Sequence, residues 1–598
     1  MYLDYDETYW AVDIEADSLT PRVIYCMAYE NIVTKEKGIL TDANEIFNFF
    51  ADRVGHRYVG HNLLKFDAPN LNRLLGTKLS VTSCIDTLVL STLYHPGLEG
   101  GHSLDSWGVR IRMPKGVFND WSKLSKEMMD YCQQDVAVTA ELYRRLVKVM
   151  RKIGFSEKTC YIQHHFTAIL ERQRKNGFYF DGQRAMVFYQ QLRRREDELT
   201  ELIQNAFPPE RVLVRERPRV LLDGRLAAQY VKDSARYVIE EFGDTYRAYE
   251  DVPFNIGSPK QRVDKLTALG WEPDEFTKTG LPKPTEKSLA KFAESSGIPE
   301  AALLTKWLSI NGRANMVNNW LENWNEQDSC MHGDLFVANT LRLRHSNPNS
   351  GNIPGVRTCK DEDGVEHVLY GEAGYFTYEA RDLWTARPRR VLVGTDAAGL
   401  ELRMLAHYLK RPSFNEQVLS GDPHQYNADL AGVSRPRAKT LLYAIQYGAQ
   451  ANKVASIIKG TKKEGAALRE QFLERLGLKG VMDEAISEQA AGRVWLVDGA
   501  GLVCPSPHSA LNYKLQGGGA RVMAQAAIFL ERYIRTDGLD SLKVGDIHDE
   551  WQYDVDPRDS RRHAERSVQS IREAGEELNL TIPLDGTAKE GLTWAQTH

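Results

Sequence analysis

Four side chains recur at every fourth position in the stretch R-P-R-A-K-T-L-L-Y-A-I-Q-Y-G; they are Arg435, Lys439, Tyr443 and Tyr447. Residues i and i+4 lie on one face of an α-helix, so the stretch predicts a helix with two cations and then two phenols along one face. This order suits a nucleoside triphosphate, because cations bind phosphate oxygens and aromatic rings pack against a sugar and a base. An amphipathic helix with core tyrosines and solvated cations has the same spacing, so the row alone leaves both interpretations open.

Two acidic clusters favour the first interpretation. The apolar run at 391–395 predicts a buried strand that ends at Asp396, and a glycine-bearing turn delivers His548, Asp549 and Glu550 to the start of another strand. Carboxylates gathered at strand ends are costly unless a positive charge neutralises them, and a divalent cation is the usual solution. Taken singly, each cluster is more often a solvated turn. Their occurrence together with the cationic–aromatic row predicts a metal site.

A second set of acids lies near the start of the chain. Asp13 and Glu15 are two residues apart in a predicted strand and therefore share one face. Asp67 follows later, and Tyr131 and Asp135 are one turn apart on a predicted helix. Each piece alone is unremarkable, since an Asp-x-Glu pair on an edge strand is usually solvated.

Together these segments resemble DNA polymerase family A, the bacterial DNA polymerase I class, and most closely the replicative polymerases of short-tailed phages. The family's motifs A, B and C are matched at 396–403, 435–448 and 548–550, and further blocks are matched at 340–357 and 506–517. The acids near the start resemble the 3′–5′ exonuclease attached to these polymerases. The resemblance covers nearly the whole chain and is weakest at about 207–253.

The resemblance implies a multidomain α/β and α+β fold, in which a ribonuclease H-like 3′–5′ exonuclease domain precedes a thumb–palm–fingers polymerase domain. The expected ranges are 1–155 for the exonuclease domain, 156–335 for the thumb with a short Arg-rich insertion at 207–253, 336–423 for the palm, 424–511 for the fingers and 512–598 for the returning palm. Long helical patterns at 189–207 and 286–324 suit a thumb. A chain of 598 residues is also too long for one core.

By the resemblance, the chain adds deoxynucleotides to a primer 3′ end by two-metal phosphoryl transfer. Two Mg²⁺ ions, with Mn²⁺ as an alternative, are expected at Asp396, Asp549 and the main-chain carbonyl of Ala397. Lys439 is expected to neutralise the leaving pyrophosphate, and Arg435 to bind the γ-phosphate. The other expected roles are His424 at the triphosphate, Glu401 as a sieve against ribonucleotides, Tyr443 beneath the sugar, Tyr447 beside the template base, and Arg342, Asn512, Gln516 and His548 at the DNA.

The same resemblance assigns two further Mg²⁺ ions to the exonuclease acids Asp13, Glu15, Asp67 and Asp135. Tyr131 is expected to orient the attacking water. Because all four acids are present, active proofreading is expected. Asp86 fits the same domain as a structural residue.

Composition is compatible with these expectations. The net charge of −5 alone points away from nucleic acid, but phosphate contact depends on local charge. Arginines cluster at 193–195, 211–225 and 381–390. Such runs are more often solvated faces, but here duplex contact is expected because they fall in the presumed thumb and palm. Scattered cysteines indicate neither zinc nor disulfides. The lack of a signal peptide or long apolar stretch predicts an intracellular protein, in the cytoplasm of a bacterial host, away from membranes.

Three rival functions fit the sequence less well. A replication accessory protein without catalysis would have gaps in the acidic sets. An enzyme that is mainly an exonuclease would not need Lys439, Tyr443 and Asp549 together. An RNA polymerase is disfavoured because Glu401 matches the sieve and single-subunit RNA polymerases lack proofreading. Expected partners are primer–template DNA and deoxynucleoside triphosphates; whether a thioredoxin-like or other processivity factor, or a replisome helicase–primase, also binds stays open.

Overall fold

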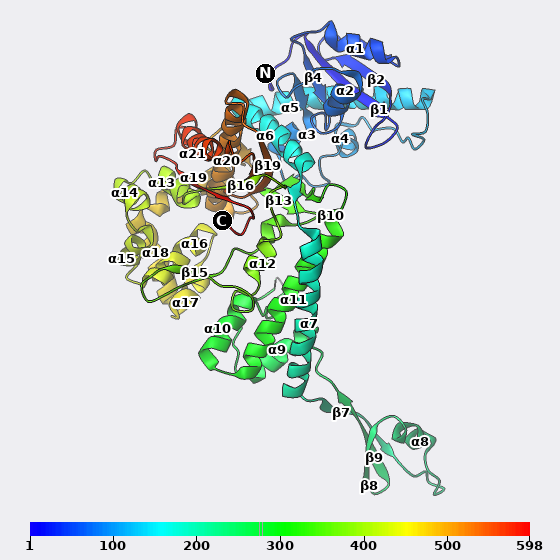
Figure 1. The fold of residues 1–598 in the computed structure, drawn as a ribbon, viewed down its shortest axis with the longest axis vertical. Helices are drawn as coiled ribbons and strands as arrows, with labels where there is room; N and C mark the ends of the chain where they lie inside the picture. Colours follow the sequence, from blue (N-terminus) through cyan, green and yellow to red (C-terminus); the bar gives the residue numbers. More distant parts are fainter. Residues whose placement is uncertain (274, 278, 598) are drawn as a thin grey trace. The chain divides into compact units, whose positions relative to one another are not determined.

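The computed structural model describes residues 1–273, 275–277 and 279–597. They form two compact units (Figure 1). The first unit comprises Met1–Tyr179, Cys330–Ile353 and Thr385–His598, and the second comprises Phe180–Ser329 and Pro354–Trp384. No helix among the described residues combines the length and apolar character that a membrane span requires.

A five-stranded sheet in the order β3-β2-β1-β4-β5 organises the start of the first unit. β1 pairs antiparallel with β2 and parallel with β4. The strands are β1 (Tyr9–Ala16), β2 (Ile24–Asn31), β3 (Lys37–Leu40), β4 (Arg57–Gly60) and β5 (Cys84–Asp86), and the helices are α1 (Ala43–Ala51), α2 (Asp67–Leu75), α3 (Thr87–Tyr94), α4 (Leu104–Ile111) and α5 (Lys126–Ile153).

Successive residues of β1 face two different cores. Trp10, Val12 and Ile14 pack in the cluster that contains Phe49 and Phe50 of α1. The odd-numbered residues before Asp13 pack instead in the cluster of α5, which includes Cys132 and Val136. Because side chains alternate along a strand, Asp13 and Glu15 continue the series that faces α5.

A second sheet of the first unit has four antiparallel strands in the order β19-β20-β16-β21. Its strands are β16 (Val391–Ala397), β19 (Ser541–Ile547), β20 (Glu550–Val555) and β21 (Gly586–Gly591), and it packs with α6 (Glu157–Asn176), α20 (Ala510–Thr536) and α21 (Ser560–Glu577). Buried Arg521 connects α20 to two other segments. Its Nε lies 2.6 Å from Asp498 Oδ2, and its Nη2 donates to Thr159 O of α6. Thus α6, which lies in the range expected for the thumb, packs in the first unit.

Short helices follow β16 and carry the cationic–aromatic row. They are α13 (Leu400–Leu409), α14 (Pro412–Ser420), α15 (Pro423–Ala431), α16 (Arg435–Gln446), α17 (Ala451–Ile458), α18 (Lys462–Leu476) and α19 (Leu478–Ala490). Local signals delimit them: Asp422 caps α15, Pro436 lies in the first turn of α16, and Thr461 with Glu464 forms a capping box at α18. The remaining elements of this unit are β6 (Phe178–Tyr179), β11 (Cys330–Met331), β12 (Asp334–Val337), β13 (Leu343–Ser346), η1 (Ser350–Asn352), β17 (Val494–Trp495), β18 (Gly501–Leu502) and η2 (Pro507–Ser509).

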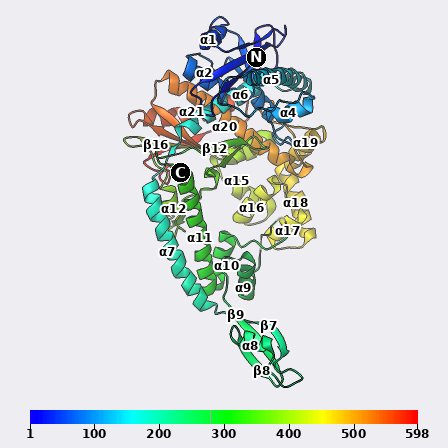
Figure 2. The ribbon, with the colours of Figure 1, turned by 90° about the vertical axis from the view of Figure 1, so that its right-hand side faces the viewer.

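The second unit is built on two long helices that lie side by side in Figures 1 and 2, α7 (Gly182–Ala206) and α11 (Pro299–Asn323). The predicted helical pattern at 286–324 is interrupted at Gly297, whose φ of 65° ends α10 (Glu286–Ser296). Trp307 Nε1 of α11 donates to Thr200 Oγ1 of α7 at 3.0 Å. The unit also contains α9 (Pro259–Ala268), β10 (Trp324–Asn325), β14 (Thr358–Lys360), β15 (Glu366–Val368) and α12 (Thr377–Arg381).

The expected insertion at 207–253 folds as a small sheet in the order β7-β9-β8 with one helix. Its elements are β7 (Glu210–Pro218), α8 (Ala228–Ser234), β8 (Val238–Phe242) and β9 (Thr245–Val252). Tyr246 and Ala248 of β9 are fully buried, and Tyr246 Oη donates to Asp233 Oδ2 at 2.6 Å.

Candidate active sites

A hydrogen-bonded strand pair brings Asp396 and Asp549 together. β16 runs antiparallel to β20 with Asp396 opposite Glu550, and Ala397 N donates to Asp549 O at 3.0 Å. The tight turn from β19 to β20 consists of His548 and Asp549, with His548 at a φ of 62°. The end of β16 and this turn therefore place the predicted metal acids on neighbouring chain segments.

Glu550, the third acid of the segment 548–550, has a different role. It is buried, and its Oε1 accepts hydrogen bonds from Gln552 Nε2 at 2.8 Å and from the Trp594 indole. Asp396 is exposed and Asp549 is half-buried. Carboxylate and carbonyl oxygens are the donors that Mg²⁺ prefers, so Asp396, Asp549 and the Ala397 carbonyl fit such an ion.

The cationic–aromatic row lies on α16 and its C-terminal cap. Arg435, Lys439 and Tyr443 lie within the helix, and Tyr447 is the capping residue, whose φ of −83° continues the turn. Lys439 is exposed, whereas Arg435 Nε is bound to Asp422 Oδ2 at 2.6 Å. The interaction with Asp422 was not predicted from the sequence.

The aromatic end of this row faces two other predicted residues. The Tyr443 ring centroid lies 6.0 Å from that of His424, and Tyr447 Oη donates to Glu401 Oε2 at 3.4 Å. Burial lowers the pKa of His424, and Lys439 and Arg435 lower it further. The neutral imidazole therefore suits a hydrogen bond with a nucleotide.

Gly448 fixes the chain directly after the row. Its φ is 85°, and an added Cβ would lie 2.4 Å from the His508 carbonyl oxygen. Glycine alone tolerates both conditions without strain. The segment after α16 therefore stays close to the segment that precedes α20.

The residues predicted to contact DNA surround the same location. Gln516 and the charge of Arg342 both lower the pKa of Tyr447, and Arg342 also lowers the pKa values of Glu401 and His548. Burial has the largest effect on each of these three pKa values, raising those of Tyr447 and Glu401 and lowering that of His548. Asn512 lies one turn before Gln516 on α20. Its buried Oδ1 has no hydrogen-bond partner in the described part of the chain, which leaves it open to an external donor.

The acids predicted for an exonuclease converge between β1, α2 and α5. Asp67 begins α2, and its Oδ1 accepts from Ile14 N at 3.2 Å, which fixes it beside Asp13 and Glu15. Asp135 lies on α5, one turn after Tyr131. All five predicted side chains therefore come from elements of the first unit, between β1 and α5.

Burial changes the protonation of these acids. It raises the pKa of Glu15 to about 8, of Asp67 to about 7 and of Asp135 to about 6. Burial and then the neighbouring Asp67 and Asp135 raise the pKa of Asp13 well above its usual range. Asp135 Oδ1 is buried and has no hydrogen-bond partner among the described residues. An acid set in this state fits a divalent cation, which would neutralise the carboxylates and favour their charged form.

Two neighbours of these acids escaped the sequence analysis. Lys115 Nζ lies 2.6 Å from Asp135 Oδ2. Cys132 Sγ lies 3.4 Å from Asp13 O, and Asp13, Glu15 and Cys132 offer ligand atoms within 4.8 Å of one another. Lys115 lies in an irregular segment without periodicity, so no local pattern marks it. Cys132 could have been noticed as the residue after Tyr131.

Asp86 is a structural residue, as expected. Its carboxylate accepts from the backbone N–H groups of Asn62, Leu64 and Leu88 at 2.9–3.1 Å. It thereby caps α3 and holds the segment that leads to Asp67.

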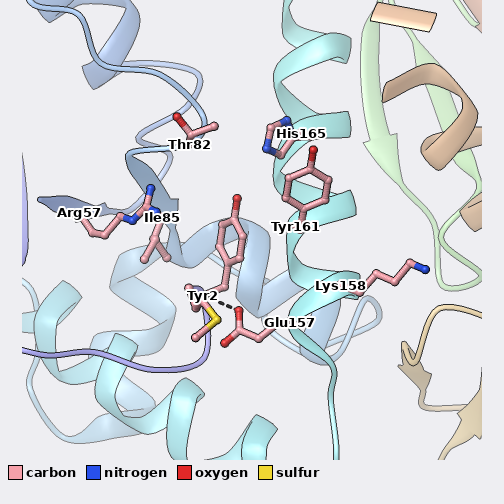
Figure 3. Close-up of a pocket in the computed structure, with 9 residues that line it drawn as sticks. Tyr2, Arg57, Thr82, Ile85, Glu157, Lys158, Tyr161 and His165 are labelled. Atoms are coloured by element: carbon pink, nitrogen blue, oxygen red, sulfur yellow. Dashed lines mark hydrogen bonds between the residues drawn. The ribbon is translucent and has the colours of Figure 1, made fainter. Parts of the chain in front are cut away.

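A cavity of about 390 Å³ lies elsewhere in the first unit, between α6 and the segment around β4 and β5 (Figure 3). Its walls include Tyr2, Arg57, Tyr161 and His165. Glu157, which also lines it, accepts from Tyr2 N at 2.6 Å and from Leu3 N at 2.9 Å. None of the described residues that line this cavity belongs to either acidic set.

The arginines of the insertion are largely neutralised by acids of the same insertion. The ion pairs are Arg211–Asp251, Arg215–Asp233, Arg219–Glu241, Arg225–Asp223 and Arg247–Glu216, at 2.6–3.5 Å. Residues 207–253 contain eight Lys and Arg against nine Asp and Glu. The insertion is therefore not basic overall, and duplex contact there stays a prediction.

Comparisons with known proteins show what the chain as a whole is similar to. A family model described as "DNA polymerase family A" matches residues 228–495. The DNA-directed DNA polymerases of Enterobacteria phage T3 and Escherichia phage T7 are each 28% identical over 671 residues, with 91% of this chain and 93% of the relative covered. That of Escherichia phage Phieco32 is 34% identical over 35% of this chain and 40% of the relative.

Among solved structures, the POL domain of Pol1 from M. smegmatis in complex with DNA primer-template and dNTP has a TM-score of 0.72 and 18% identity, with 98% of this chain and 95% of that chain covered. At this identity the likeness shows the fold alone. It confirms the predicted multidomain fold class; the domain boundaries and the roles of the site residues stay predictions.

Proposed function

The chain is a member of DNA polymerase family A and synthesises DNA, and we propose that it does so at the site formed by Asp396, Asp549 and the face of α16. The observation that supports this most is that Ala397, which directly follows Asp396, donates its backbone N–H to Asp549 O, so the two acids lie on neighbouring segments. The row on α16 would then bind the incoming nucleotide.

Family A polymerases depend on metal ions. For this chain we propose two Mg²⁺ ions, replaceable by Mn²⁺, at Asp396, Asp549 and the Ala397 carbonyl. When bound, the metal ions neutralise charge that develops on the primer 3′ oxygen and on the leaving pyrophosphate.

We propose the remaining roles from the family resemblance, and the side-chain chemistry is compatible with them. Arg435 and Lys439 bind the phosphates as a fork and as a point charge. His424 donates to the triphosphate, and Tyr443 lies under the sugar. Glu401, fixed by Tyr447, blocks the space that a ribose 2′ hydroxyl would need.

We further propose that Arg342, Asn512, Gln516 and His548 bind the minor groove of the primer–template duplex, with Tyr447 beside the template base. Minor-groove acceptors are nearly the same in all base pairs. Donors placed there accept any sequence and still detect a misshapen pair.

The four clustered acids support our proposal of a second activity, 3′–5′ proofreading hydrolysis. Asp13, Glu15, Asp67 and Asp135 would hold two Mg²⁺ ions, which would supply an activated water and stabilise the leaving 3′ oxygen. Tyr131 would orient that water. We propose that these residues lie in an exonuclease domain, 1–155, that precedes the polymerase domain, with 156–335 as the thumb, 336–423 and 512–598 as the palm, and 424–511 as the fingers.

The phage relatives support a replicative role inside an infected bacterial cell. The partners are primer–template DNA and deoxynucleoside triphosphates. The folded insertion at 207–253 offers a surface for a processivity factor or a helicase–primase, which pull-down against host and phage replication proteins would identify.

Two variants test both sites at once. Asp549→Ala should abolish primer extension and leave 3′-end degradation intact, because it removes one acid from one site. Asp13→Ala with Glu15→Ala should abolish degradation, leave extension intact and raise the error rate. Either variant losing both activities while still folded, as judged by circular dichroism, would refute the assignment of two separate sites.

A further inference from the structure

Lys115 is held at the exonuclease acids by an anchored segment. It follows α4, where Met113 N donates to Gly108 O at 2.8 Å. Gln134 Nε2 of α5 donates to Pro114 O at 3.0 Å. Pro114 directly precedes Lys115, and Gln134 directly precedes Asp135. The backbone that carries Lys115 is thus fixed to the same helix turn as the acid.

Aromatic side chains enclose the lysine and its neighbours. Lys115 Nζ lies 4.7 Å from the centroid of the Tyr131 ring, within the range of a cation–π contact. Phe118 and Trp121 pack against the same ring at 5.8 and 5.9 Å. An added Cβ on Gly116 would meet Tyr131 at 3.4 Å, which shows how closely the backbone covers this ring.

The ammonium is the positive charge nearest to Asp135. It lies 2.6 Å from Asp135 Oδ2, and the two side chains are 22% and 4% exposed. Screening by solvent is weak at this depth, so the ammonium competes with any other cation for that carboxylate.

We propose that Lys115 is a positioning residue of the exonuclease: its ammonium aligns Asp135 and Tyr131 and acts as an internal counter-ion that must release Asp135 when a divalent cation binds. This inference depends on the proposed exonuclease function. It assigns Lys115 two effects of opposite sign, since the charge opposes metal binding while the contact with Tyr131 favours turnover.

The test uses the full-length chain with Asp396→Ala and Asp549→Ala, so that the polymerase acids no longer bind metal. Free Mn²⁺ is measured by electron paramagnetic resonance, and removal of 3′ nucleotides is measured at saturating Mn²⁺. Lys115→Met should bind Mn²⁺ about tenfold more tightly, because the ammonium no longer competes for Asp135. A tenfold change in the dissociation constant corresponds to the free energy of a one-unit pKa shift. Its kcat should fall by about tenfold or more, because Tyr131 is no longer aligned. Lys115→Arg keeps the charge and should stay within about twofold of the parent affinity, well below the tenfold step of a lost charge.

A merely structural role predicts weaker Mn²⁺ binding and lower kcat together, and that result, or an unchanged Mn²⁺ affinity, would overturn the proposal. If Lys115→Met does not fold, Lys115→Gln replaces it with the same expectations. Asp13→Ala with Glu15→Ala in the same background is the control for the exonuclease itself. If that control still binds Mn²⁺ and degrades 3′ ends as the parent does, the exonuclease assignment fails whatever Lys115→Met does.

Discussion

The ion pair between Arg435 and Asp422 leads to a prediction about nucleotide affinity. Arg435 Nε and Nη2 donate to the two oxygens of Asp422 at 2.6 and 3.3 Å, so the guanidinium that we assign to the γ-phosphate already has an acidic partner. Hydrogen bonding by Arg435 lowers the pKa of Asp422 to about 2, so this partner is charged throughout the working pH range. A triphosphate must displace it.

Asp422→Asn removes the competing charge with little structural change. Asn is as good a helix cap as Asp, so its Oδ1 can keep accepting from His424 N and Gln425 N at the start of α15. The two side chains are 49% and 42% exposed. Exposed pairs are weak, so the KM for deoxynucleotides should fall by only about two- to fivefold, with kcat unchanged.

Steady-state primer extension at varied nucleotide concentration measures this effect. Asp429→Asn is the matched control, because it removes the same charge from α15 while Asp429 bonds to Gln425. The difference between the two variants should shrink at high salt. An equal decrease of KM in both variants, or no decrease in Asp422→Asn, would show that Arg435 does not exchange Asp422 for phosphate.

Three further predictions concern catalysis and stability. Lys439→Ala should lower kcat by about 10²–10³, because it removes charge stabilisation that is realised in the transition state; rapid-quench extension measures this, and a change confined to KM would contradict it. Tyr443→Phe should discriminate against dideoxynucleotides by about 2–4 kcal/mol, since the phenol hydroxyl no longer fills the site of the missing 3′ hydroxyl; competition between the two nucleotide types measures the ratio, which should not change if Tyr443 lies away from the sugar. In EDTA, the unfolding midpoint should fall as pH rises from about 6 to 8, because the folded protein holds protons on Glu15 and Asp67 that the unfolded chain has lost. Thermal denaturation should show a flatter profile with Mg²⁺, and equal slopes would contradict the buried acid cluster.

Local patterns predicted the elements that carry the two sites. The apolar run before Asp396 forms β16, and the i, i+4 relation of Tyr131 and Asp135 holds on α5. The same relation holds on α16 up to Tyr443, with Tyr447 at its cap. Periodicity is a property of one continuous segment, so it can be recognised in the sequence without knowledge of the fold.

Interactions between distant segments could not be predicted in this way. Lys115 meets Asp135, and Arg435 meets Asp422, only after the chain has folded. The arginines of the insertion read as a basic run, yet their acidic partners such as Asp251 and Glu241 lie on other strands of the same small sheet. Charge clusters in sequence therefore say little about charge on a surface until strand pairing is known.

The two acid sites meet the same electrostatic problem in different ways. Asp396 is exposed and Asp549 half-buried, so water screens their mutual repulsion, and a cation can enter with little rearrangement. Glu15 and Asp135 are buried, which raises their pKa values and makes a resident ammonium useful. Metal binding at the proposed exonuclease site would therefore release protons and displace Lys115, whereas Asp396 of the proposed polymerase site is exposed to solvent. Removal of 3′ nucleotides should therefore depend more steeply on Mg²⁺ concentration and pH than primer extension does, and equal dependence of the two activities in a Mg²⁺ titration at about pH 6 and about pH 8 would contradict this difference.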